Sequence, residues 1–144
     1  LHRVRVGNRA GATGEGLSFL PSSGVSILHV SDSIFYSNTA KGIAIRPGAS
    51  ASAQAHIRNT IFERNGQGVH ADGSTSTLGV LVNIDDSVFS GNAGSAQIAV
   101  GGSMITGNWV GLSPVAPALI ISHGNNQLFA NISTGAFSGN IGLQ

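Results

Sequence analysis

Hydrophobic and polar positions alternate along this chain in short steps that recur at a fixed interval. The pattern Phe-x-x-Asn returns every 27 residues, over 35–38, 62–65 and 89–92. Two later segments keep the pattern with an aliphatic residue in place of phenylalanine, over 105–108 and 128–131. Self-similarity at a period of about 20 to 50 residues is typical of a solenoid, in which each turn packs against its neighbours. The chain is therefore expected to be one short unit stacked several times.

Each unit holds three apolar steps of three to five residues, separated by Gly, Ser and Asx. Such steps are too short for helices, and their period-two alternation is typical of β-strands. One of the three steps begins with a small residue, and its copies lie at 16–19, 42–45, 68–71, 96–100, 111–112 and 135–137. The pattern predicts an all-β fold, a single-stranded parallel β-helix of five to six turns that is about 25 to 30 Å long.

The chain is expected to form a single domain over 1–144, with a less regular first turn at 1–24 and clear repeats at 25–137. Equivalent side chains of successive turns then lie above one another and can hydrogen-bond along the rod. A ladder of amides is predicted for Asn38, Asn65, Asn92, Asn108 and Asn131. A second column of Asx residues, which tolerate the left-handed backbone of a corner, is predicted for Asp32, Asn59, Asp86 and Asn125.

These turns resemble the right-handed parallel β-helix superfamily, the pectate-lyase-like fold. Within it, the chain looks most like secreted bacterial β-helix repeat proteins of undefined function, whose turns read roughly as Ser/Thr-x-Ile/Phe-x-x-Asn after an apolar strand and an asparagine. The segments 59–65 and 103–108 match that pattern, and 122–126 resembles the last turn of such proteins. The resemblance covers about 25–137 and implies a right-handed helix and an extracellular or cell-surface location. It implies little about activity, because one fold carries many functions.

Composition narrows the function classes. Only 9% of the residues are charged and the net charge is +1, which gives no electrostatic case for binding nucleic acid or an anionic membrane. The absence of cysteine excludes a disulfide framework and thiol catalysis. The longest apolar run, 116–121, is far too short to span a bilayer. The chain starts at Leu1 without a methionine, so it is expected to be a processed or excised piece.

Two histidines occupy equivalent positions in successive units, His29 and His56, and the third unit carries Asn83 there. Their side chains are expected about one strand spacing apart on one face of the rod. With Asn83 or Asp85 nearby, they are candidates for binding a metal ion or a sugar. The alternative is a solvent-facing position that tolerates any polar residue, which the replacement by Asn83 favours. No cofactor and no metal site are predicted on this basis.

Carboxylates test the hypothesis of an enzyme, because glycoside hydrolysis needs a pair of Asp or Glu residues and lyases of this fold need acidic calcium ligands with a basic residue. Only Asp85 and Asp86 stand in tandem, and their basic partner would be Arg58, one turn above Asp85. Neighbouring residues on a strand point to opposite faces, so this pair is not expected to converge on one ligand.

The preferred hypothesis is a secreted, non-catalytic β-helix that acts as a structural or carbohydrate-contacting module. One alternative is a polysaccharide-degrading enzyme or a remnant of one. Another is a rod that self-associates through its open ends or through an apolar stripe. The stripe is predicted because Ile34, Ile61, Val88 and Met104 precede the Phe and Ile anchors and should face away from the core.

Overall fold

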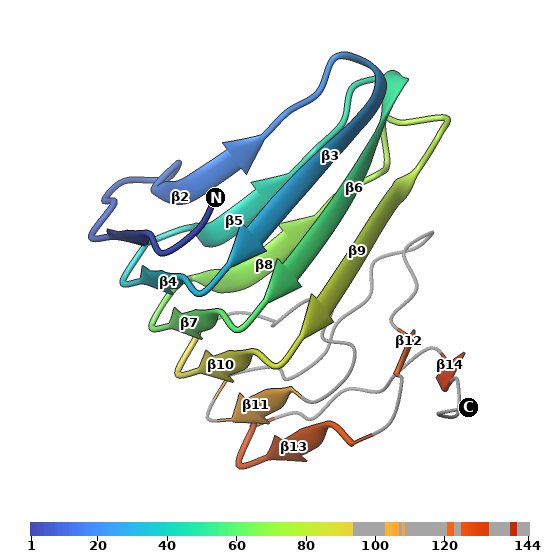
Figure 1. Cartoon of the computed structure of the whole chain (residues 1–144). Coiled ribbons are helices and arrows are strands. Elements are labelled where there is room, and N and C mark those ends of the chain that lie inside the picture. The colour runs from blue at the N-terminus through green and yellow to red at the C-terminus, as the bar shows by residue number, and fades with distance from the viewer. Residues whose placement is uncertain (94–102, 107, 109–120, 123–124, 133–138, 141–144) are drawn as a thin grey trace.

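The computed structural model describes residues 1–93, 103–106, 108, 121–122, 125–132 and 139–140. These residues contain strands and no helix, and all pairs of named strands are parallel (Figure 1). The strands are β1 (Arg5–Gly7), β2 (Glu15–Phe19), β3 (Ser23–Ser31), β4 (Ile34–Tyr36), β5 (Lys41–Ile45), β6 (Ser50–Arg58), β7 (Ile61–Glu63), β8 (Gln67–Ala71), β9 (Val80–Asp85), β10 (Val88–Ser90), β11 (Met104–Thr106), β12 (Ile121–Ser122), β13 (Gln127–Phe129) and β14 (Gly139–Asn140).

The chain passes through three stacked sheets in rotation, which makes it a β-solenoid. The short strands form the sheet β1-β4-β7-β10-β11-β13, and the other two sheets are β2-β5-β8 and β3-β6-β9. A small separate sheet pairs β12 with β14. Each turn therefore consists of a short strand, a five-residue strand and a long strand, as in β4, β5 and β6. The expectation of an all-β parallel solenoid is confirmed.

The predicted number of turns is wrong. About three turns carry a strand in all three sheets, fewer than the five to six expected from the repeat. After β10, the short-strand sheet continues through β11 and β13, but the described residues add no further strand to the other two sheets. The repeat interval falls from 27 to 16 residues at this point of the sequence, which leaves less chain for three strands per turn. The predicted copies at 96–100, 111–112 and 135–137 lie outside the described residues.

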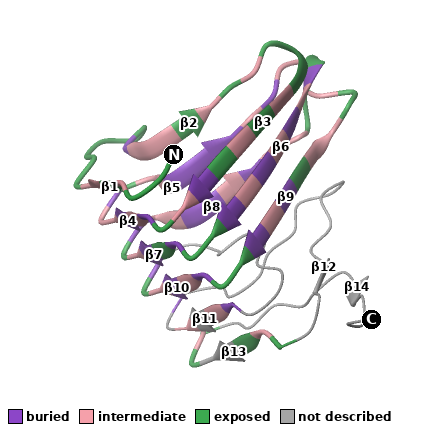
Figure 2. Cartoon of the chain, in the orientation of Figure 1, coloured by how far each residue is buried: buried purple, intermediate pink, exposed green. Residues whose placement is uncertain are grey.

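A column of phenylalanines fills the core beside the short strands. Phe35, Phe62 and Phe89 are fully buried, and their rings stack with centroids 5.4 and 4.7 Å apart. In the same column, Val6 packs against this core from the first turn. Along the long strands, Figure 2 shows that buried residues alternate with more exposed ones. The apolar anchors of the repeat therefore form the core, as the period predicts.

The predicted amide ladder is present. The side-chain Nδ2 of each asparagine donates to Oδ1 of the asparagine one turn further, at 2.9, 3.1, 3.0 and 3.0 Å from Asn38 to Asn131. The same Oδ1 atoms also accept from the backbone N–H of the preceding ladder residue, as in Asn38 to Asn65 at 3.2 Å. Four of the five ladder residues are buried, namely Asn38, Asn65, Asn92 and Asn108. Polar corners are thereby satisfied inside the rod.

A second ladder of hydroxyl groups lies on the other side of the aromatic column. Its buried members are Ser33, Thr60, Ser87 and Ser103. Each hydroxyl that donates does so to a backbone carbonyl two residues earlier, as from Thr60 to Arg58 at 2.9 Å. The next turn's hydroxyl accepts from the backbone N–H above it, as Ser87 Oγ does from Thr60 at 3.2 Å. Both corners that flank the short strands are therefore closed by side chains.

The backbone at these corners is left-handed. The corner that leads into the short strands confirms the predicted Asx column, and Asn59 Nδ2 donates to Asp32 Oδ1 at 2.7 Å. Its residues with positive φ are Arg3, Asp32, Asn59, Asp86 and Asn125. The corner that follows the short strands also has positive φ, at Asn8, Ser37, Arg64, Gly91 and Ala130. Three of these, Ser, Arg and Ala, are residue types that seldom adopt this conformation.

Candidate functional site

The outer face of the sheet β3-β6-β9 carries most of the candidate chemistry. Along β6, residues with odd numbers from Ala51 to Ile57 are buried, and the residues between them face solvent. The parallel register aligns these outward residues across the three strands. We name each aligned set after the residues that dominate it. The apolar row is Ile27 and Leu81 with Gln54 between them, the histidine row is His29, His56 and Asn83, and the charged row is Arg58 and Asp85 with Ser31 beside Arg58.

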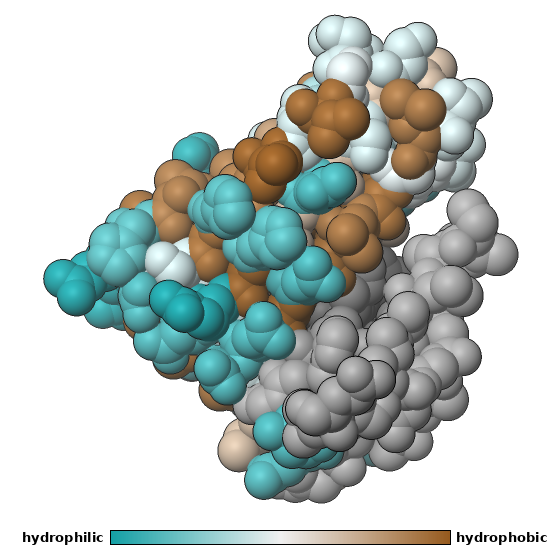
Figure 3. Space-filling view, turned by 45° about the vertical axis from the view of Figure 1, so that its right-hand side comes forward, coloured by the Kyte–Doolittle hydropathy of each residue, from teal (hydrophilic) through white to brown (hydrophobic). Residues whose placement is uncertain are grey.

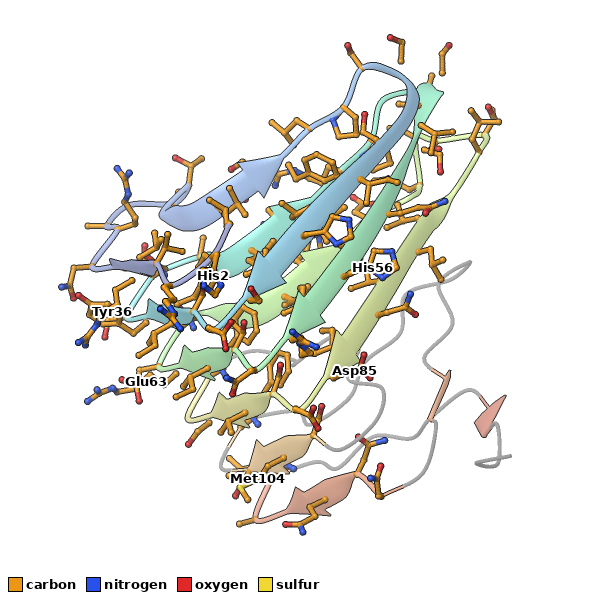
Figure 4. The ribbon with its side chains drawn as sticks, in the orientation of Figure 1. His2, Tyr36, His56, Glu63, Asp85 and Met104 are labelled. Carbon is orange, nitrogen blue, oxygen red and sulfur yellow. The ribbon has the colours of Figure 1, made fainter. Side chains whose placement is uncertain are left out.

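The histidine row confirms that the two histidines are neighbours on one face. Their rings are stacked with centroids 5.1 Å apart and an angle of 15° between the planes. Nδ2 of Asn83 lies 3.4 Å from Nδ1 of His56. His29 is exposed and His56, labelled in Figure 4, is partly exposed and lies toward the end of β6. Their role in binding stays a prediction.

The apolar row lies immediately beside the histidine row. Ile27 is 55% exposed and Leu81 is 52% exposed, and Val25, one step further along β3, is 65% exposed. Leu20 and Leu78, in the loops that lead into β3 and β9, are also exposed. Figure 3 shows apolar side chains toward the upper end of this face and hydrophilic ones across its middle. The face therefore combines an apolar end with a polar middle.

The repeat pattern of the sequence does not predict the apolar row. In β3, Val25 and Ile27 lie on the outer face and Leu28 and Val30 lie on the inner face, and all four residues are apolar. A strand that is apolar on both faces is typical of burial on both sides. In this protein the outer face of β3 is open to solvent, so the apolar pattern of the strand alone does not reveal an exposed apolar row.

The acidic candidates do not converge on a common point. Arg58 is paired with Asp85 in the parallel register, one strand spacing away, as the sequence predicts, and both side chains are exposed. Asp86 occupies the left-handed corner with φ 49°, beyond the end of β9. Figure 4 shows Asp85 at the end of β9, away from His2 and Glu63. Within the described residues, no group of three or more His, Cys, Asp or Glu side chains is arranged to hold a metal ion.

One buried carboxylate was missed as a structural centre. Glu15 accepts from Arg46 at 2.7 and 2.8 Å, from Lys41 at 3.2 Å and from Ser18 at 2.6 Å. Its side chain is only 8% exposed. Burial raises the pKa of Glu15, but the hydrogen bonds from these three partners outweigh it and lower the pKa from 4.5 to about 2. Glu15 thus links β2 to β5 and to the loop after β5, and its partners saturate it.

The second apolar column faces outward, as predicted. Ile61 is 37% exposed, and Ile34, Val88 and Met104 are partly exposed, whereas the adjacent phenylalanines are fully buried. The four residues are paired in register through the short-strand sheet. Beside them, the guanidinium of Arg5 lies over the ring of Tyr36, with Cζ 5.6 Å from the ring centroid. What contacts this column stays a prediction.

Comparison with known proteins identifies no relative. No protein-family model, no curated protein and no solved structure matches the chain. None of the described residues forms a helix long and apolar enough to cross a membrane.

Proposed function

We propose that this chain is a secreted, non-catalytic right-handed β-helix of the pectate-lyase-like type, located outside the cell or at its surface. It contacts a polysaccharide through the outer face of β3, β6 and β9. The observation that carries this proposal is the pairing of two rows, one with exposed Ile27 and Leu81 and one with the stacked rings of His29 and His56. Sugars present C–H patches next to hydroxyl groups, and the two rows offer apolar and hydrogen-bonding surface in the same order.

The dimensions of the face favour a narrow ligand. The three described strands of this face are six to nine residues, or about 20 to 30 Å, long, and together they are about 14 Å wide. An extended glycan that runs along the rod crosses one strand every 4.8 Å or so, which is close to the length of one sugar unit.

Catalysis is not part of the proposal, because Glu15 is held by hydrogen bonds to its neighbours and the tandem pair Asp85 and Asp86 does not converge on one point. Glu15 is saturated by Arg46, Lys41 and Ser18. Asp85 lies on the sheet face, but Asp86 lies at the corner. A glycosidase needs two carboxyl groups about 5 to 10 Å apart that flank one bond. The divergence of the tandem pair argues against that arrangement.

Binding of polysaccharides tests the proposal. The wild-type chain is expected to be retained by at least one glycan in affinity electrophoresis, and His56→Ala and Leu81→Ser should each lower the affinity several-fold. Ile61→Ser is the matched control, since it removes an exposed aliphatic side chain from another sheet. Retention of full affinity in both face variants, or an equal loss in Ile61→Ser, would refute the assignment of this face.

Self-association is the second candidate function, and the column of Ile34, Ile61, Val88 and Met104 favours it. Its members are aligned in register and partly open to solvent. In the described chain, β1, β2 and the first part of β3 are also edge strands at one end of the rod, whereas residues 1–3 pair with the last residues of β3. Sedimentation at increasing concentration tests this candidate: association that Ile61→Asp abolishes supports it, and a monomer at all concentrations excludes it.

A further inference from the structure

The histidine row places two imidazole rings side by side, and imidazole nitrogens are common metal ligands. His29 and His56 stand opposite each other in the register of two parallel strands, so their Cα positions are one strand spacing apart. Cross-strand neighbours at this distance bring their side-chain ends together. The buried Val30 and Ile57, next to them in sequence, hold the two strands against the core. The backbone therefore presents two imidazoles side by side on a rigid sheet.

A bridging ion requires a modest change in ring orientation. A metal ion takes imidazole nitrogens at about 2.0 to 2.1 Å, so both nitrogens must approach a common point. The two rings are nearly parallel, with centroids 5.1 Å apart, and their in-plane lone pairs do not yet meet. Rotation about χ2 of histidine is soft, and the exposed ring of His29 is open to solvent for such a rotation. Both rings must therefore turn before their nitrogens can meet at one ion.

Asn83 completes the arrangement around His56. Its Nδ2 atom lies 3.4 Å from His56 Nδ1, a long contact for a hydrogen bond. The oxygen and nitrogen of an amide exchange places by a flip of the side chain. The flipped amide would accept a hydrogen bond from Nδ1–H and leave Nε2 of His56 as the ligand atom. A ligating histidine almost always donates its other N–H to such an acceptor, which fixes the tautomer and the ring orientation.

We propose that His29 and His56 bind one divalent transition-metal ion, with Asn83 as the positioning residue for His56 and with water in the remaining coordination positions. Imidazole ligands suit zinc, nickel and copper, and a site with two protein ligands leaves positions open to a second molecule. The inference does not depend on glycan binding, because the ion is held by the protein alone. Carbohydrate binding and metal binding can therefore succeed or fail separately.

Isothermal titration calorimetry with zinc chloride and nickel chloride tests the site, using the untagged chain in a buffer that does not coordinate metals. We expect one saturable site with micromolar affinity for the wild type. His29→Ala and His56→Ala should each weaken binding by roughly tenfold or more, and the double variant, which has neither imidazole, should bind more weakly than either single variant. Both positions face solvent, so neither variant should affect folding.

His2→Ala is the matched control. His2 is also exposed, and its Nδ1 lies 2.9 Å from Ser31 Oγ and 3.1 Å from Asp32 Oδ2, outside the histidine row. Unchanged affinity in His2→Ala, together with loss in both row variants, supports the proposal. It is overturned if the wild type does not bind either ion at millimolar concentration, if the row variants bind like the wild type, or if His2→Ala weakens binding as much as they do.

Discussion

Replacing one amide in the middle of the ladder should destabilise the protein more than any surface change of the same size. Asn65 Oδ1 accepts from the backbone N–H of Asn38 at 3.2 Å and from Asn38 Nδ2 at 2.9 Å. Asn65 Nδ2 donates to the carbonyl of Phe35 at 3.0 Å and to Asn92 Oδ1 at 3.1 Å. In Asn65→Ala, Asn38 Nδ2 keeps the carbonyl of Val6 and Asn92 Oδ1 keeps the backbone N–H of residue 65.

One buried backbone group, the N–H of Asn38, then loses its partner, whereas the carbonyl of Phe35 loses the bond from residue 65 but stays in the parallel pairing of β4 with β7. A buried group without a partner costs about 1 to 3 kcal/mol, so we expect Asn65→Ala to lower the free energy of unfolding by about 1 to 3 kcal/mol. With a urea m-value of about 2 kcal/mol per molar, the unfolding midpoint should fall by about 0.5 to 1.5 M. Amide hydrogen exchange gives a local measurement, because the N–H of Asn38 should lose its protection.

Asn83→Ala is the control, since that amide lies on the outer face with one long contact to His56. Its urea midpoint should stay close to that of the wild type. Equal midpoints for the two variants would show that the ladder adds no more stability than a surface amide, and the reasoning would fail.

Asn65→Asp tests the electrostatics of the ladder. It keeps the size of the side chain but places a carboxylate oxygen against the carbonyl of Phe35 and Oδ1 of Asn92, which both accept hydrogen bonds. Burial raises the pKa of such a carboxyl, so the variant's relative stability should decrease as the pH rises through that raised pKa. Urea midpoints at pH 4 and pH 7, each compared with the wild type, measure this difference. A pH-independent loss would contradict it.

Three further predictions concern other parts of the rod. Because the pKa of Glu15 is lowered to about 2, the stability it contributes is complete above its unfolded value of 4.5 and is lost as the pH falls from 4.5 toward 2. Glu15→Gln should lower the free energy of unfolding by about 1 to 3 kcal/mol at pH 7 and should weaken the dependence of stability on pH between 4.5 and 2. Glu63→Gln, the control, should leave that dependence unchanged. Phe62→Ala should lower the free energy of unfolding by about 3 to 5 kcal/mol, because the ring is fully buried between two others. Phe19 is only half-buried, so Phe19→Ala should cause a smaller loss. Equal urea midpoints for the two variants would refute this prediction. The purified chain should release no reducing ends or unsaturated products from acidic or neutral polysaccharides, and activity that disappears in Asp85→Asn would contradict the non-catalytic proposal.

The sequence predicts those parts of the fold that repeat in register. Phe35, Phe62 and Phe89 recur at a constant interval because stacked turns force equivalent residues into one column, and the ladder asparagines recur for the same reason. The outward column at Ile34, Ile61 and Val88 followed from the alternation of a strand. In each case one geometric constraint acts on many turns, so a single sequence contains several independent observations of it.

Features that occur in one turn only were not predictable in this way. Glu15 gains its partners from Lys41 and Arg46 across two neighbouring segments, and no periodicity marks that cluster. Ser37 and Arg64 adopt a left-handed backbone because the ladder and the sheets on either side fix the corner, although their own conformational preference opposes it. The sequence predicts too many turns because the short-strand anchors continue through β11 and β13, beyond the third complete turn, without a matching strand in the other two sheets of the described chain.

The ladder also bears on how the protein ages chemically. Asn65–Gly66 is the sole Asn-Gly step in the chain, and such steps deamidate when the nitrogen of the glycine attacks the side-chain amide carbon and expels ammonia. In the folded rod, the N–H of Gly66 donates to the carbonyl of Asn38 at 2.8 Å, and both ends of the Asn65 amide are hydrogen-bonded. The attacking nitrogen and the leaving group are thus both restrained, so the lifetime of this amide should follow the lifetime of the folded state.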